Sequence, residues 1–130
     1  MEYDWNKSLE PGSIVCASIG DFNGNKKIAL FLVLYDEQND KNIMDDQNVV
    51  ALKLSTQNTC ASNYIIQITS KANKFLDKNC VVCCSKLHTL HKKSNVYKLL
   101  GVVNSNTLKR VYKVYRKFQN ELNDQILNNI

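Results

Sequence analysis

The sequence is poor in the residues that break up a fold. Its 130 residues include one proline and four glycines, which is neither the composition of a disordered linker nor that of a fibrous repeat. No apolar run approaches the length of a membrane span, and the acidic N-terminus lacks the apolar segment of a signal peptide. These absences predict one globular domain over residues 1–130, located in the cytoplasm and away from membranes.

The sequence has an odd number of cysteines, which cannot all pair within one chain. There are five cysteines, and three of them crowd together at Cys80, Cys83 and Cys84, which favours a reducing compartment over a disulfide framework. Cys80-X-X-Cys83 followed by His88-X-X-His91 has the residue types of a zinc site. Residues three apart in a strand point to opposite faces, however, so Cys80 and Cys83 cannot share a metal ion without a bulge. We therefore expect neither a metal nor a cofactor.

Charge is distributed unevenly along the chain. Residues 1–50 carry four Lys/Arg and nine Asp/Glu, whereas residues 51–130 carry thirteen Lys/Arg and three Asp/Glu. A basic second half suits a polyanionic partner such as nucleic acid, or an acidic protein. The same lysines can form an ordinary solvated face, so charge alone leaves both interpretations open.

The longest apolar run covers residues 28–34 and follows a glycine turn and two lysines, Lys26 and Lys27. Its length and lack of charge predict a central strand that is buried on both faces. The two lysines either contact phosphate or only keep the turn soluble. Shorter apolar or alternating runs predict five more strands, at residues 13–19, 49–55, 62–69, 79–87 and 96–100.

The last expected element is a helix at residues 105–127, because apolar side chains recur there every three or four positions. A polar arm at 1–11, an acidic loop at 36–48 and a turn at 91–95 complete the chain. Consecutive short strands predict an antiparallel, coiled sheet or small barrel with the helix over one opening. Leu122, Ile126 and Ile130 extend past what such a barrel covers, so we expect an apolar surface for a partner.

Five short motifs occur in one order along the chain. They are Gly12-Ser13-Ile14-Val15, Lys27-Ile28-Ala29-Leu30-Phe31-Leu32, Leu54-Ser55-Thr56-Gln57, and the segments 80–89 and 100–108. Over residues 12–122 this order resembles the MazF/PemK family of toxin endoribonucleases, in which the second motif reads Arg-Pro-Ala-Leu-Val-Leu and the third Ile-Thr-Ser-Gln. The resemblance implies a mainly β fold, an SH3-like small barrel of the MazF/PemK (CcdB-like) type with a C-terminal helix, and usually a homodimer.

The same resemblance implies a reaction and a set of residues. The reaction is metal-independent cleavage of single-stranded RNA, in which the ribose 2′-hydroxyl attacks the adjacent phosphate, and an antitoxin-like protein is the further partner. Lys27 and Ser55 occupy the positions of the family's catalytic arginine and threonine. His88, expected with His91 just after the fifth strand, is a candidate acid or base near neutral pH. The residues expected to contact nucleic acid are Lys26, Lys27, Lys53, Thr56 and Lys86.

Two functions remain open at this point. The first is a toxin-like ribonuclease, and the second is a catalytically impaired relative whose barrel binds nucleic acid or a protein. The second is favoured by Lys27, Ser85 and His88, which replace an arginine, an acidic residue and an arginine of the family. At Lys27 the ammonium is a point charge, whereas a guanidinium grips two phosphate oxygens at once. Ser55 also has two interpretations, since a serine at a strand end can simply cap the following turn.

Overall fold

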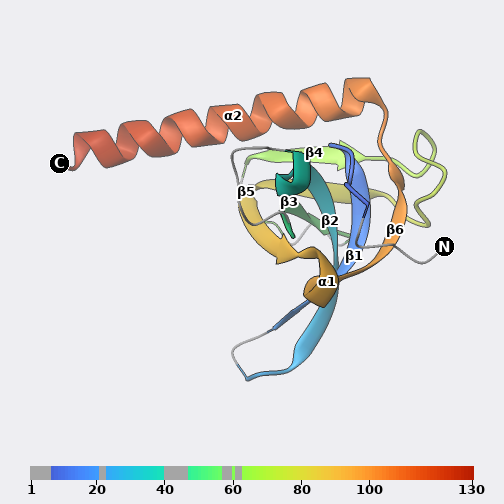
Figure 1. The fold of residues 1–130 in the computed structure, drawn as a ribbon. Coiled ribbons are helices and arrows are strands. Elements are labelled where there is room, and N and C mark those ends of the chain that lie inside the picture. The colour runs from blue at the N-terminus through green and yellow to red at the C-terminus, as the bar shows by residue number, and fades with distance from the viewer. Residues whose placement is uncertain (1–6, 21–22, 40–46, 57–59, 61–62) are drawn as a thin grey trace.

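Six antiparallel strands and a long C-terminal helix make up the fold (Figure 1). The computed structural model describes residues 7–20, 23–39, 47–56, 60 and 63–130. The strands are β1 (Ser13–Gly20), β2 (Lys26–Asp36), β3 (Asn48–Ser55), β4 (Ile65–Ile68), β5 (Cys80–His91) and β6 (Val96–Val102). The helices are η1 (Glu37–Asn39, a 3-10 turn), α1 (Lys92–Asn95) and α2 (Ser105–Asn128). The prediction of a mainly β fold with a C-terminal helix is confirmed.

The strands form one sheet in the order β4-β5-β3-β2-β1-β6, with every neighbouring pair antiparallel. The sheet coils around a main core, to which α2 contributes Val111. The helix lies across β4 and β5. The buried side chains of the main core are Ile14, Leu32, Leu34, Leu52, Leu54, Ile66, Ile68, Leu76, Cys80, Val82, Cys84, Val103 and Val111.

A second core packs on the opposite face of the same sheet. Successive side chains of a strand alternate between faces, so β2 sends Leu32 and Leu34 into the main core and Phe31 and Val33 into the second core. This confirms β2 as a central strand that is buried on both faces. The buried side chains of the second core are Leu9, Val15, Ala17, Phe31, Val33, Val49, Ala51, Leu90 and Val96.

The expected burial of β2 is wrong at its beginning, because Ile28 is 63% exposed. Lys26 to Leu32 pair with β1, but the pairing of β2 with β3 reaches only from Asp36 back to Phe31. The first part of β2 therefore belongs to a two-stranded hairpin that extends away from the rest of the sheet (Figure 1). The apolar run thus contains two structural environments, a hairpin arm and a core strand.

A buried ion pair joins two segments that the sequence indicated to be solvated. Asp36, expected at the start of the acidic loop, instead ends β2 and is fully buried, and its Oδ2 lies 3.1 Å from the Nζ of Lys92, which is 1% exposed. The same oxygen accepts a hydrogen bond from the backbone N–H of Leu9 at 2.6 Å. Gln38 donates its N–H to Oδ1 at 3.0 Å and accepts from the Lys92 ammonium. Residues 40–46 of the expected loop lie outside the described residues.

Strand β5 is longer than the sequence indicated. It continues to His91, so that His88 and His91 lie within the strand and not after it. Its register against β3 shifts sharply, since Leu52 pairs with Leu87 whereas Leu54 pairs with Val82. The expected turn at 91–95 contains α1, whose first turn is capped by His91, because its Nδ1 accepts a hydrogen bond from the N–H of Ser94 at 3.2 Å.

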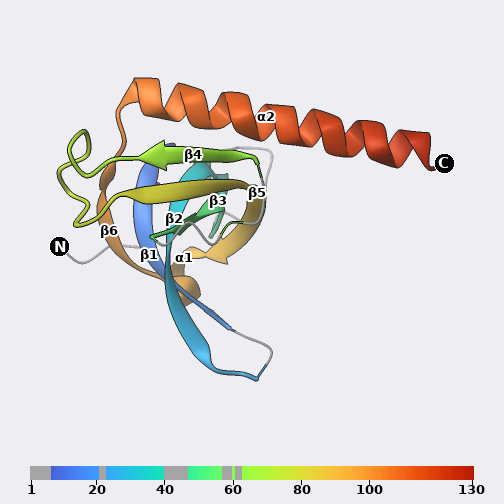
Figure 2. The ribbon, with the colours of Figure 1, turned by 180° about the vertical axis from the view of Figure 1, so that it is seen from behind.

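Helix α2 begins at a polar cap and ends beyond the sheet. The Asn104 side chain accepts a hydrogen bond from the N–H of Thr107 at 2.8 Å, which satisfies one of the free donors of the first turn. The C-terminal part of α2 extends past the strands (Figure 2), and Leu122, Ile126 and Ile130 are exposed as expected. None of the helices in the described part of the chain has the length and apolar character that a membrane crossing needs.

Candidate functional site

A cleft opens where β2 and β3 separate. Beyond the pair Phe31–Lys53, β2 continues beside β1, whereas Leu54 and Ser55 of β3 pair with β5. The gap between the diverging strands encloses about 320 Å³. We call it the Lys27–Ser55 cleft; the described residues that line it are Lys27, Ile28, Ala29, Leu30, Lys53, Leu54, Ser55 and Thr56.

The cleft brings together four of the residues singled out from the sequence. Lys27 comes from β2, Lys53 and Ser55 come from β3, and Thr56 follows β3 directly. Lys27 and Thr56 are exposed, and Lys53 and Ser55 are half-buried. The β2 wall of the site thus carries the Lys27 ammonium, and the β3 wall carries the Lys53 ammonium together with the hydroxyl groups of Ser55 and Thr56. No acidic side chain is found among the described residues that line it.

Lys26 and Lys86 lie outside the lining of the cleft, although both are exposed. Neighbouring residues of a strand point to opposite faces, so Lys26 points away from the face that carries Lys27. Lys86 belongs to the part of β5 where the register shifts. Contact between either lysine and nucleic acid stays a prediction.

His88 is positioned beside Lys53 by the register of three strands. Phe31 pairs with Lys53 and Ala51 pairs with His88, and Ala51 and Lys53 share one face of β3 because they are two residues apart. The imidazole meets the Phe31 ring edge-on, with 5.2 Å between the ring centroids. Its pKa is lowered from the ordinary 6.5, first by burial and then by the positive charges of Lys53 and Lys86. Near neutral pH the ring is therefore uncharged and able to accept a proton.

The three clustered cysteines, Cys80, Cys83 and Cys84, are buried and behave as small core residues. Cys80, Val82 and Cys84 share the main core, as strand alternation predicted. Burial and a hydrogen bond with Cys60 raise the pKa of the Cys83 thiol to about 12, and burial raises the pKa of Cys84 to about 12. Neither Cys83 nor Cys84 therefore supplies a thiolate nucleophile at neutral pH. Within the described ranges, no cluster of three or more His, Cys, Asp or Glu side chains is arranged to hold a metal ion.

Sequence patterns alone did not reveal the walls of the cleft. Ile28, Ala29 and Leu30 belong to an apolar run that indicated a core strand, yet they line the cleft beside Lys27. The signal that could have found them is the run's position directly after a glycine turn, since Gly24 has a φ of 79° and marks the tip of the hairpin.

A coiled antiparallel sheet of six strands followed by a C-terminal helix is the arrangement of a MazF-type fold, and comparison with solved structures shows this fold directly. A MazE–MazF complex from Deinococcus radiodurans matches with a TM-score of 0.67 and 14% identity, over 88% of this chain and 97% of that chain. An endoribonuclease from a mycobacterial species, in complex with its cognate antitoxin, matches with a TM-score of 0.63 and 15% identity, over 87% and 96%. The Mycobacterium tuberculosis toxin MazF-mt6 matches with a TM-score of 0.57 and 13% identity, over 81% and 96%.

At the level of sequence, no protein-family model and no curated protein matches the chain. The identities to the solved structures are 13% to 15%. What these matches show is therefore the fold, and they confirm the resemblance that the five motifs indicated. The fold matches do not establish an activity for this chain, so any activity has to be argued from its own residues.

Proposed function

We propose that this protein is a MazF-like toxin that cleaves single-stranded RNA in the Lys27–Ser55 cleft. The observation that carries the proposal is the convergence of Lys27, Lys53 and Ser55 from two strands on one cleft, with His88 beside Lys53. These residues can supply the groups that are required when the ribose 2′-hydroxyl attacks the adjacent phosphate. Such a reaction needs a proton acceptor, a proton for the leaving oxygen, and donors on the phosphate.

The two lysines hold the phosphate in the proposed reaction. Lys27 and Lys53 stand on opposite walls of the cleft, so their ammonium groups bind different nonbridging oxygens and stabilise the charge that develops there. The Ser55 hydroxyl donates a further hydrogen bond to the phosphate. The attack forms a bond from the 2′-oxygen to phosphorus and breaks the bond to the 5′-oxygen, leaving a 2′,3′-cyclic phosphate and a 5′-hydroxyl.

His88 transfers the proton in this scheme. Because its pKa is lowered, the ring is neutral at physiological pH and takes the proton of the 2′-hydroxyl. The imidazolium then returns a proton to the departing 5′-oxygen. Burial and the neighbouring charges of Lys53 and Lys86 make the charged ring a strong proton donor.

The second candidate function is an RNA-binding module without cleavage, and one observation favours it. His88 lies beside Lys53 but is not among the residues that line the cleft. In addition, Lys27 offers a single charged group where the family has the two-pronged arginine. Loss of one preorganised donor in such a site typically lowers the rate by about two to three orders of magnitude.

We further propose that the protein acts in the cytoplasm, as a homodimer that an antitoxin-like protein can bind. Its five free cysteines support a reducing compartment. Leu122 and Ile126 near the end of α2, and Ile130 just beyond it, are exposed and supply an apolar surface for a protein partner.

The decisive experiment incubates the purified protein with a long single-stranded RNA, with and without EDTA. Cleavage that persists in EDTA, leaves a 2′,3′-cyclic phosphate and disappears in Lys27→Ala supports the ribonuclease. Lys113→Ala is the matched control, because it removes one exposed positive charge from α2, outside the cleft. Intact RNA that is bound with a steep salt dependence supports the binding module, whereas protein that neither cleaves nor binds RNA contradicts both.

A further inference from the structure

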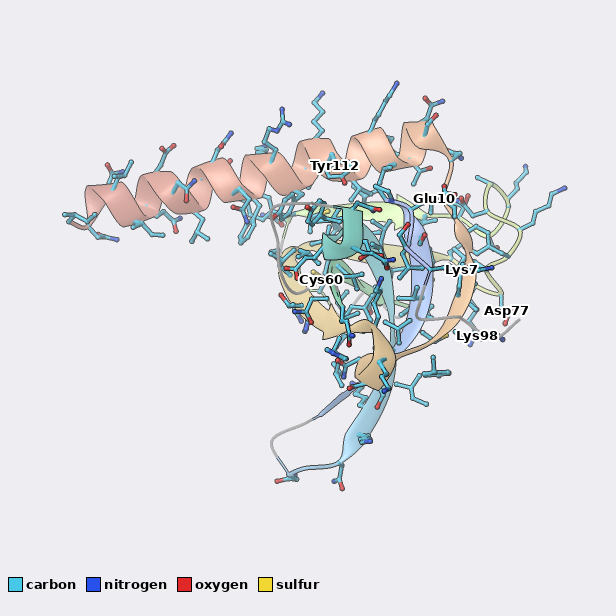
Figure 3. All side chains as sticks on the ribbon, viewed as in Figure 1. Lys7, Glu10, Cys60, Asp77, Lys98 and Tyr112 are labelled. Atoms are coloured by element: carbon cyan, nitrogen blue, oxygen red, sulfur yellow. The ribbon has the colours of Figure 1, made fainter. Side chains whose placement is uncertain are left out.

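Two thiols from separate parts of the chain are in contact. Cys60 lies between β3 and β4, Cys83 lies in β5, and their side chains are hydrogen-bonded to each other. Cys60 accordingly lies close to the β5 ribbon (Figure 3). Both cysteines are free thiols, and neither takes part in the proposed reaction. Close approach of the two side chains is the first geometric requirement for a disulfide.

The contact lies between two strands that flank β5. β3 and β4 are the neighbours of β5 in the sheet, with Ser55 of β3 opposite Val81 and Ile65 of β4 opposite Cys83. Cys60 is halfway between Ser55 and Ile65 in the sequence. A bond between Cys60 and Cys83 would therefore tie the connection between β3 and β4 to the strand that separates them.

Cys84, the neighbour of Cys83 in β5, is a poorer partner for Cys60. Its side chain belongs to the main core, where its thiol donates a hydrogen bond to the carbonyl of Val82 at 3.9 Å. Neighbouring residues of a strand point to opposite faces, and Cys83 is not part of the main core. The hydrogen bond and the direction of the side chain both single out Cys83 as the partner.

The two thiols differ in their access to a dissolved oxidant. Cys60 is half-buried, whereas Cys83 is 2% exposed, so an oxidant reaches Cys60 first. Burial and the hydrogen bond with Cys60 raise the pKa of Cys83 to about 12, which leaves about one part in 10⁵ as thiolate at pH 7. Contact offsets this scarcity, because well-oriented groups within one molecule react as if present at about 10⁵ M or more.

We propose that Cys60 and Cys83 form a reversible disulfide when the protein is exposed to hydrogen peroxide. The peroxide oxidises the Cys60 thiol to a sulfenic acid: a sulfur–oxygen bond forms, the oxygen–oxygen bond breaks and one water leaves. The Cys83 sulfur then attacks the Cys60 sulfur, and the departing hydroxide takes the Cys83 proton and leaves as a second water. A dithiol reductant restores both thiols by exchange. This inference does not depend on the proposed RNA cleavage.

The test treats the reduced protein with hydrogen peroxide, blocks the remaining thiols with N-ethylmaleimide in denaturant and digests the chain with trypsin without reduction. We expect the peptides 54–71 and 79–86 to be joined through Cys60 and Cys83, and the number of free thiols to fall from five to three. Dithiothreitol is expected to restore all five thiols. Because the cross-link closes the segment 60–83 into a loop, oxidation is also expected to raise the unfolding temperature by about 5 °C or more.

Cys60→Ser is expected to abolish both the joined peptides and the rise in unfolding temperature. Cys16→Ser, the matched control at another half-buried cysteine, is expected to change neither. Cys60 is outside both cores, so its variant decides the question even if Cys83→Ala fails to fold. The proposal is refuted by a link from Cys60 to Cys84, by a link between two molecules, by five intact thiols after peroxide, or by an unchanged unfolding temperature in the oxidised protein.

Discussion

Replacing Lys92 with methionine removes the cation of the buried pair and leaves the Asp36 carboxylate in the protein interior. Among the described residues, this carboxylate has three partners, the Lys92 ammonium at 3.1 Å and the backbone N–H groups of Leu9 and Gln38 at 2.6 and 3.0 Å. Methionine has a similar length and adds no polar group, so the substitution tests the charge and not the packing.

The expected loss is about 3–5 kcal/mol of unfolding free energy, the usual cost of stranding one charge of a buried pair. The free energy of unfolding of a domain of this size is about 5–15 kcal/mol, so the variant loses a large fraction of its stability. Asp36→Asn combined with Lys92→Met removes both charges but keeps an oxygen for the Leu9 amide. We expect this double variant to be more stable than Lys92→Met alone, with a loss of about 1–2 kcal/mol.

Urea unfolding followed by circular dichroism measures these free energies, with Lys113→Met as the matched exposed control. Lys92→Met, Asp36→Asn alone and the double variant form a cycle that isolates the interaction energy between the two side chains. A loss below about 1 kcal/mol for Lys92→Met, or a double variant no more stable than that single variant, would refute the reasoning.

Three further predictions concern other parts of the fold. Gly101→Ala places a Cβ 2.5 Å from the Phe75 ring, so we expect a loss of about 1–3 kcal/mol in thermal unfolding, partly recovered by adding Phe75→Leu. Tyr112→Phe removes the hydrogen bond from α2 to the Leu34 carbonyl and is expected to cost about 0.5–1.5 kcal/mol in the same assay. If His88 is the base, the acid limb of RNA cleavage is expected to have its midpoint below pH 6.5, because the pKa of His88 is lowered and the ring must be uncharged. A cleavage profile of His88→Gln that keeps this acid limb would contradict the role.

Much of the fold follows from local patterns in the sequence. The uncharged run before Asp36 indicated a strand with cores on both faces, and Phe31 to Leu34 meet that expectation. The recurrence of apolar side chains every three or four residues indicated α2. Its N-terminal cap was also predictable, because Asn104 bonds to a backbone N–H only three residues further on. These features were predictable because each depends on residues that are close in sequence.

Features that depend on distant partners were not predictable. Asp36 and Lys92 are 56 residues apart, and each on its own is typical of a solvated loop or turn. The end of β5 carries His88 and His91, which the sequence pattern placed after the strand, although both residues pair with β3. In the cleft, Lys27 and Ser55 followed from the family resemblance, whereas the place of His88 beside Lys53 required the register of β2, β3 and β5.

The two halves of β2 lie in different environments and are expected to differ in how well they tolerate substitution. Residues 31–34 are enclosed by two cores, so their amides are expected to exchange with solvent only when the whole domain unfolds. Residues 26–29 pair with a single neighbour in the hairpin arm, and side-chain changes there affect little of the folding free energy. If the cleft binds RNA as proposed, substitutions within residues 26–29 can therefore change which RNA is bound, whereas residues 31–34 preserve the architecture.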